Sequence, residues 1–171
     1  PLAAAKHINK LAGELGLPPF RIAVLSGDDL SNYLDEQTLL EAPTMGGNQL
    51  SGRDLKAANV YLGGDAVANA LAMDVDIVLV GRTTDSALVL GPLLHEFGWA
   101  NDDWDKLAAG TICGHLLECG AQVTGAYFAD PGFKDVPALA EVGFPVAEVY
   151  ESGNFIITKP EQTGGCVTSA T

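Results

Sequence analysis

The side chains best suited to chemistry follow short apolar segments, where glycines and carboxylates stand side by side. Asp28 and Asp29 come directly after the apolar residues 22–25. Adjacent carboxylates can hold a hydroxyl group or a hard cation, although Asp is also a favoured helix N-cap. Gly63 and Gly64 precede a stretch of helical composition, where a bare backbone and a helix N-terminus attract anions. A tight turn from strand to helix explains the same two glycines, so both interpretations stay open.

Arg82 is the most informative single residue of a third such segment. The chain has 9 Lys and Arg against 22 Asp and Glu, and this arginine directly follows the apolar residues 76–80. Its planar guanidinium suits the carboxylate or phosphate of a substrate. The alternative is an internal salt bridge, for example to Asp85 or Asp28.

The residues that follow Arg82 complete the predicted substrate-binding set. Thr84 and Ser86 carry hydroxyl groups on either side of Asp85. Asp85 and Ser86 are suited to orienting a substrate, and either is equally suited to capping the next helix. Neither a phosphate loop nor the G-x-G-x-x-G nucleotide signature occurs in the chain.

A second group of reactive side chains lies in residues 102–118 and just beyond, a predicted helix. His115 stands three residues before Glu118 and four before Cys119, so a helix places all three on one face. His115 with Glu118 is the predicted acid–base pair, and Asp85 is the third catalytic candidate. Half of a metal site and a packed core histidine are the alternatives for the same spacing.

Two glycines interrupt this helix. Gly110 and Gly114 each cost a helix about 0.8–1 kcal/mol relative to Ala. Their presence indicates that another segment approaches the helix closely.

We expect no structural zinc. The chain has three Cys and three His without any paired ligand spacing. No cofactor is indicated by any motif.

Apolar periodicity and turn residues predict an α/β protein. We expect helices at residues 2–15, 65–73, 87–97, 102–118 and 136–142, strands at 21–25, 58–62, 76–80 and 122–128, and a C-terminal hairpin of 146–150 with 155–158. A long loop covers residues 38–52. Alternating strands and helices favour a mostly parallel sheet with helices on both faces. Residues 22–25 and 77–80 should lie in this sheet and run parallel, which would bring Asp28 or Asp29 near Arg82 and Asp85 in one cleft.

Charge and cysteine usage limit the classes of partner and compartment. The net charge of −13 argues against binding to nucleic acid or to an anionic membrane. The longest apolar runs, residues 77–80 and 87–90, fall far short of the ~20 residues that a membrane-spanning helix needs. An odd number of cysteines with no C-x-x-C indicates reduced thiols in the cytoplasm.

The two ends predict that residues 1–171 are one α/β unit and the central segment of a longer domain. The chain begins with Pro1 in a helical context, and glycines followed by Thr and Ser close it. Leu2, Ile8, Leu11 and Leu15 form an apolar face of the first helix. We therefore expect a homo-oligomer, or association with the remaining parts of the longer protein.

Motifs along most of the chain resemble one known family. They are VLSGDD at 24–29, YLG at 61–63, DIVLVGRTTDSA at 76–87, HEFGW at 95–99, LAAGT at 107–111, GHLLECGAQVTG at 114–125, YFADP at 127–131, GFP at 143–145 and TKPEQTGG at 158–165. Together they resemble the acyclic terpene utilisation family, the AtuA-like proteins.

The resemblance implies a pathway rather than a mechanism. Such proteins are linked to bacterial growth on citronellol and geraniol, whose breakdown passes through acyl-CoA esters. It implies an enzyme or pathway protein of acyclic terpene or branched-chain acyl-CoA breakdown that binds a small anionic substrate such as an acyl-CoA. The alternative is a non-catalytic binding or assembly subunit beside an acyl-CoA carboxylase. The resemblance carries no residue roles over to this chain.

Overall fold

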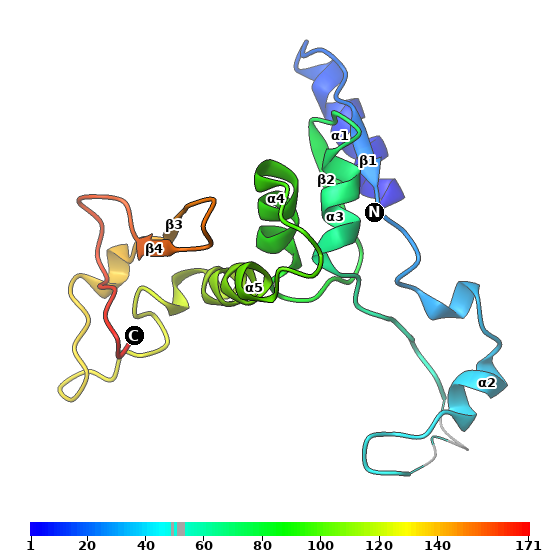
Figure 1. Ribbon diagram of the computed structural model, residues 1–171. Helices are drawn as coiled ribbons and strands as arrows, with labels where there is room; N and C mark the ends of the chain where they lie inside the picture. Colours follow the sequence, from blue (N-terminus) through cyan, green and yellow to red (C-terminus); the bar gives the residue numbers. More distant parts are fainter. Residues whose placement is uncertain (49, 51–53) are drawn as a thin grey trace. The chain divides into compact units, whose positions relative to one another are not determined.

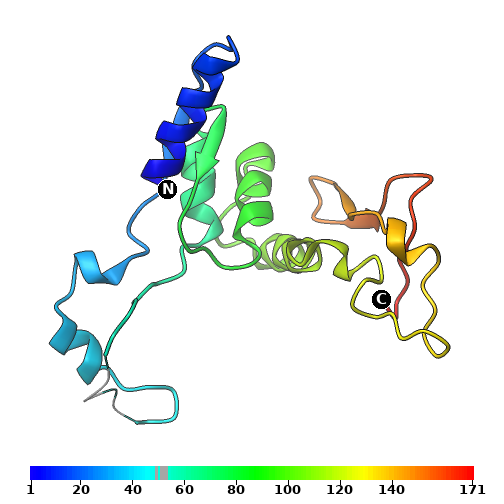
Figure 2. The ribbon, with the colours of Figure 1, turned by 180° about the vertical axis from the view of Figure 1, so that it is seen from behind.

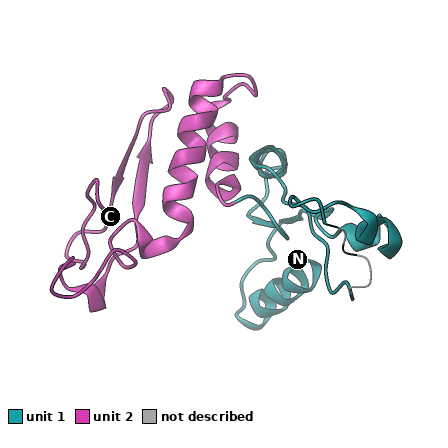
Figure 3. Cartoon of the chain, turned by 90° about the horizontal axis from the view of Figure 1, so that it is seen from below, with its two compact units in different colours: residues 1–84 teal, residues 85–171 magenta. Residues whose placement is uncertain are grey.

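The computed structural model describes residues 1–48, 50 and 54–171 (Figure 1). The chain divides into two compact units, residues 1–84 and 85–171, each of which is described by itself (Figure 3). Part of the predicted 38–52 loop, at residues 49, 51 and 52, lies outside the described residues. The position of the chain inside a longer domain stays a prediction.

A short parallel sheet organises the first unit. Strand β1 (Ile22–Val24) pairs with β2 (Ile77–Leu79) in parallel, and Ile22 stands opposite Ile77. The prediction that these two segments run parallel in one sheet is therefore confirmed. Helix α1 (Leu2–Glu14) packs beside β1, and α3 (Gly64–Leu71) packs beside β2 (Figures 1 and 2).

Two short helices and an exposed helix face complete the first unit. The 3-10 helix η1 (Leu30–Asn32) and helix α2 (Glu36–Glu41) follow β1. Residues 38–41 of the predicted 38–52 loop are therefore helical. Asp35 stabilises the start of this helix as its N-cap by accepting a hydrogen bond from Thr38 N. Of the expected apolar face, Leu2, Leu11 and the C-cap residue Leu15 are 66%, 41% and 72% exposed, whereas Ile8 is half-buried.

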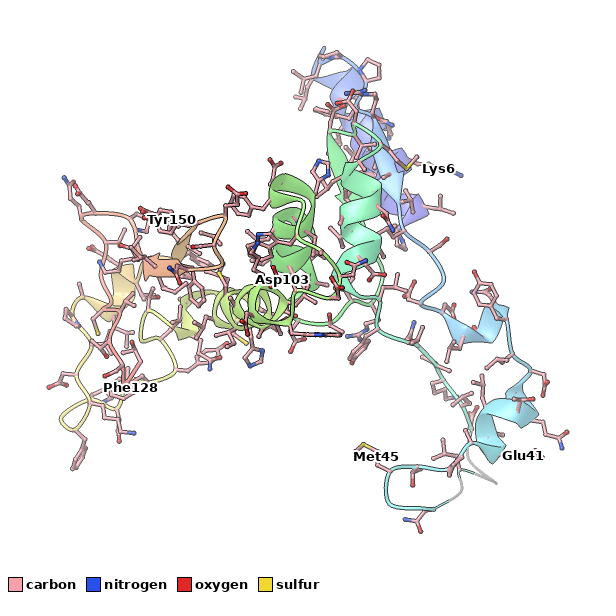
Figure 4. All side chains as sticks on the ribbon, in the orientation of Figure 1. Lys6, Glu41, Met45, Asp103, Phe128 and Tyr150 are labelled. Carbon is pink, nitrogen blue, oxygen red and sulfur yellow. The ribbon has the colours of Figure 1, made fainter. Side chains whose placement is uncertain are left out.

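Two packed helices form the centre of the second unit. Helix α4 (Ala87–Phe97) contains Pro92 and ends at Gly98, whose φ of 59° lies in the left-handed region that favours glycine. Helix α5 (Trp104–Glu118) packs against α4 and is capped by Asp103, which is labelled in Figure 4. Gly114 of α5 confirms the expected close approach, because a Cβ there would lie 2.8 Å from Ser86 Cα.

The C-terminal hairpin is confirmed. Strands β3 (Val146–Val149) and β4 (Phe155–Thr158) pair antiparallel, and Gly153 takes a φ of 90° in the turn. The Trp99 indole, only 5% exposed, donates a 3.0 Å hydrogen bond to the carbonyl of Glu151 and ties this turn to the end of α4.

Buried polar contacts hold the remaining turns of the second unit. Two of these turns are the 3-10 helices η2 (Gly120–Gln122) and η3 (Leu139–Glu141). The hydroxyl of Thr124, fully buried, lies 2.6 Å from the carbonyl of Gly143 and donates to it. The Cys166 N–H donates to the carbonyl of Thr124 at 3.0 Å.

The mixed α/β class is confirmed, but a mostly parallel sheet is not. In the described residues the strands form one parallel pair and one antiparallel pair. The predicted strand at 58–62 makes two isolated bridges instead, antiparallel at Asn59 with Asp29 and parallel at Leu62 with Thr83. A segment that changes partner and direction within four residues cannot extend a ladder.

Two further predicted elements differ in the second unit. Residues 122–128 form the end of η2 and turns rather than a strand, because Gly120 and Gly125 take φ values of 56° and 106°. The predicted helix at 136–142 is reduced to η3, a single 3-10 turn.

Candidate functional site

In the first unit, the Asp28 carboxylate connects the segment after β1 to Asn59 and to the segment after β2. Its Oδ2 accepts hydrogen bonds from the backbone N of Arg82 at 3.0 Å and from Asn59 Nδ2 at 3.3 Å. Gly81 lies against this carboxylate so closely that any Cβ there would collide with it. Asp28 and the Arg82 segment are thus brought together, and the contact is to the backbone of Arg82.

The backbone on both sides of Arg82 is fixed while its side chain stays exposed. Leu62 N donates to the carbonyl of Arg82, and Thr84 N donates to the carbonyl of Leu62, both at 3.0 Å. Within the described part of the chain, the Arg82 guanidinium takes part in no ion pair. The guanidinium is therefore held at the surface and is accessible to an anion.

The neighbouring candidates of the first unit act as caps. Asp29 accepts hydrogen bonds from Ser31 N at 3.1 Å and Ser31 Oγ at 2.5 Å, and thereby caps η1. These bonds to Ser31 hold the pKa of the Asp29 carboxyl below its usual range. Gly63 is the residue before α3, and the buried Gly64 is its first residue.

In the second unit, the carboxylate that faces His115 is Asp85. Its Oδ2 lies 4.0 Å from His115 Nδ1, and the side chains of Asp85 and His115 are 58% and 72% exposed. The close packing of Ser86 against Gly114 explains this neighbourhood, because it brings the residues before α4 onto the surface of α5. Two of the three catalytic candidates therefore come together.

The third catalytic candidate, Glu118, faces Cys119. The Cys119 thiol donates to Glu118 Oε2 at 2.7 Å. The hydrogen bond to Glu118, some burial and the negative charges of Glu118 and Asp85 raise the pKa of the Cys119 thiol. This cysteine is therefore kept protonated, which opposes a role as a nucleophile.

A small pocket opens beside these side chains. It encloses about 110 Å³ and is lined by His115, Leu116, Cys119, Gln122, Val123 and Thr171. Leu116 and Val123 supply apolar surface, and the other four residues supply polar atoms. The pocket is large enough for a few non-hydrogen atoms, since a cavity of ~150 Å³ binds benzene.

The sequence alone missed two of the site residues. Asn59 was not singled out, because an amide in a predicted strand carries no motif. Gln122 was placed in a predicted strand, and only the helix-breaking Gly120 before it signals the turn that brings it to the pocket.

Two further features bear on the type of site. Across residues 1–48, 50 and 54–171, no three His, Cys, Asp or Glu side chains gather closely enough to hold a metal ion. None of the helices in the same residues has the length and apolar content required to cross a bilayer.

Comparison with known families places the chain. Residues 1–171 match the family described as acyclic terpene utilisation family protein AtuA. The chain belongs to this family, as its motifs indicated. Comparison with curated proteins gives no match, and comparison with solved structures gives none either.

Proposed function

We propose that this protein is a cytoplasmic enzyme of acyclic terpene and branched-chain acyl-CoA breakdown, of the kind that degrades citronellol and geraniol. Membership of the AtuA family supports the pathway. The single observation that supports catalysis is the approach of Asp85 Oδ2 to His115 Nδ1, 4.0 Å apart, at the edge of a pocket. The reaction class that fits this arrangement is proton transfer to or from a bound acyl substrate.

The proposed roles follow from the chemistry of the two groups. A histidine is the side chain best suited to exchange a proton near neutral pH. A carboxylate beside Nδ1 orients the ring and stabilises its protonated form, which leaves Nε2 for the substrate. The 4.0 Å separation exceeds a hydrogen bond, as is common at catalytic pairs before the substrate binds.

Arg82, in the first unit, is by itself a proposed contact for an anionic group such as that of an acyl-CoA. Its exposed guanidinium can bind a phosphate or carboxylate with two parallel hydrogen bonds. Asp28 supports this role by holding the Arg82 backbone through a 3.0 Å hydrogen bond. Replacing Arg82 by Gln should raise KM for an acyl-CoA by roughly tenfold and leave kcat within about twofold.

The test is turnover of terpenoid and branched-chain acyl-CoA esters by the wild-type protein and two matched variants. His115→Asn should lower kcat by roughly 100-fold or more. His95→Asn, which replaces an exposed histidine near the end of α4, should leave kcat unchanged. Full turnover by the His115 variant would refute the acid–base assignment.

The second candidate is a non-catalytic binding or assembly subunit beside an acyl-CoA carboxylase. Large exposed aromatic side chains in the second unit favour it, among them Tyr127 at 76%, Phe133 at 88% and Phe144 at 68% exposure. Size-exclusion chromatography with and without the carboxylase tests it, and the same experiment measures self-association. Absence of turnover with every ester, together with co-elution that is lost in Phe133→Ser, would favour this second function.

A further inference from the structure

The pocket beside His115 has a chemical character that restricts what it can bind. We infer that it is a binding site for an uncharged carbonyl group, such as an amide, thioester or ester, that carries a short apolar chain. The inference rests on the proposed function for the location of the site, but it concerns binding alone. Its evidence comes from the size, the lining and the charges of the pocket.

Size sets the first restriction. The pocket encloses about 110 Å³. Because a cavity of ~150 Å³ takes the six carbons of benzene, this one takes about four or five non-hydrogen atoms. A ten-carbon terpene chain cannot fit inside it, so the pocket receives only the functional end of a long substrate or a short-chain substrate.

The lining sets the second restriction. Leu116 and Val123 offer apolar surface to a short chain. Gln122 carries both a donor and an acceptor, and in the described residues its side-chain amide has no hydrogen-bond partner. The Gln122 amide can therefore donate to a carbonyl oxygen at the mouth of the pocket, beside the His115 ring.

Charge sets the third restriction. Asp85 lies 4.0 Å from His115, and Glu118 is hydrogen-bonded to the pocket residue Cys119 at 2.7 Å. Two carboxylates therefore lie next to residues that line the pocket, and their repulsion disfavours a carboxylate ligand. A cation is attracted by the same carboxylates and can donate to the Gln122 carbonyl oxygen, so it is the competitor that the binding test has to exclude.

Three small probes of similar shape separate these effects: isobutyramide, isobutyrate and isobutylammonium. Each is titrated into the full chain at one fixed pH of about 8. The NMR signals of the His115 ring and the Val123 methyl groups report binding. The amide should shift both sets of signals and should bind roughly tenfold more tightly than isobutyrate.

Two variants identify the groups responsible. Gln122→Leu keeps the size of the side chain and should weaken isobutyramide binding by roughly five- to tenfold. Glu118→Gln removes one carboxylate and should strengthen isobutyrate binding several-fold. Glu96→Gln is the charge-matched control, because Glu96 is exposed on α4 and does not line the pocket, and it should change neither affinity.

The outcomes also separate this inference from the proposed function. Equal or tighter binding of isobutyrate or isobutylammonium, or an amide that shifts neither set of signals, would overturn the inference. If the amide binds as expected while His115→Asn retains full turnover, the binding site stands and the acid–base role fails. If the His115 variant loses turnover while isobutyramide does not bind, the catalytic role stands and this inference fails.

Discussion

Replacement of Gly114 by Ala tests the contact that organises the second unit. A Cβ at this position would lie 2.8 Å from both Cα and O of Ser86 and 2.9 Å from its Cβ. Two of these atoms belong to the backbone, so they cannot move aside as a flexible side chain does. The substitution therefore forces the start of α4 away from α5.

Two opposing effects set the size of the change. Overpacking of a tight contact costs about 1–3 kcal/mol. Ala in place of Gly inside a helix contributes about 0.8–1 kcal/mol in the other direction. We expect a net loss of about 1–2 kcal/mol in the free energy of unfolding for Gly114→Ala.

Gly110→Ala is the matched control in the same helix. A Cβ there would meet the ends of side chains, Leu90 Cδ1 at 2.8 Å and Trp99 Cζ3 at 3.1 Å. Because the leucine can change its rotamer, the helix-propensity gain should offset most of the cost. We expect the stability of this variant to lie within about 0.5–1 kcal/mol of the wild type.

Urea unfolding followed by tryptophan fluorescence measures both variants. Both tryptophans of the chain, Trp99 and Trp104, lie in residues 85–171 and report on this unit. Gly114→Ala should also lower turnover more than Gly110→Ala does, because it moves Asp85 relative to His115. A Gly114→Ala protein as stable as the wild type would refute the close contact between Ser86 and α5.

Three further substitutions test the remaining polar contacts. Asp28→Ala removes the acceptor of two hydrogen bonds and should lower the free energy of unfolding by about 1 kcal/mol, measured by circular dichroism in urea. The hydrogen bond and charge of Arg21 lower the pKa of Asp74, so their contribution is present above the unfolded pKa of ~3.9 and is lost as pH falls through the lowered folded value. Asp74→Asn should therefore flatten the acid limb of the stability curve below about pH 4, and a limb of unchanged slope would contradict the assignment. Glu118→Ala removes the main cause of the raised pKa of Cys119 and should speed its alkylation by iodoacetamide near pH 8, whereas an unchanged rate would show that Glu118 does not hold the thiol proton.

The elements that could be predicted are those in which local signals agree. Both β1 and β2 are short apolar runs followed by polar turns, and the C-terminal hairpin has a glycine where its turn needs a φ of 90°. Helix α4 ends at Gly98, a residue that suits a C-cap, and helix α5 begins after Asp103, a residue that suits an N-cap. In each case the residues that decide the structure lie within the element itself.

The elements that could not be predicted depend on contacts from elsewhere in the chain. The Asn59 side chain bonds to Asp28, 31 residues away, and the backbone around it changes partner from Asp29 to Thr83. Such a segment has the composition of a strand but not its ladder. The apolar residues 122–128 were likewise predicted as a strand, although the left-handed Gly120 and Gly125 turn the chain there.

The sequence predicts which candidate side chains share α5, but not which side chain near the start of α4 comes to face them. Helical spacing places His115, Glu118 and Cys119 on one face of α5 or at its end. Which carboxylate faces His115 depends on how closely the start of α4 approaches α5. Gly114 was the signal of that approach in the sequence, but a glycine does not name the segment that comes near it.

The arrangement of carboxylates also decides which group of the cluster can exchange a proton. Cys119 donates its proton to Glu118 at 2.7 Å, and the nearby negative charges raise the pKa of the thiol. A thiolate beside two carboxylates is disfavoured, so attack by sulfur on a carbonyl is disfavoured as well. Asp85 lies 4.0 Å from Nδ1 of His115, where a carboxylate can orient the ring. Within this cluster the negative charge thus suppresses the nucleophile and leaves the imidazole of His115, and we infer a reaction that moves a proton rather than one that forms a bond to the protein.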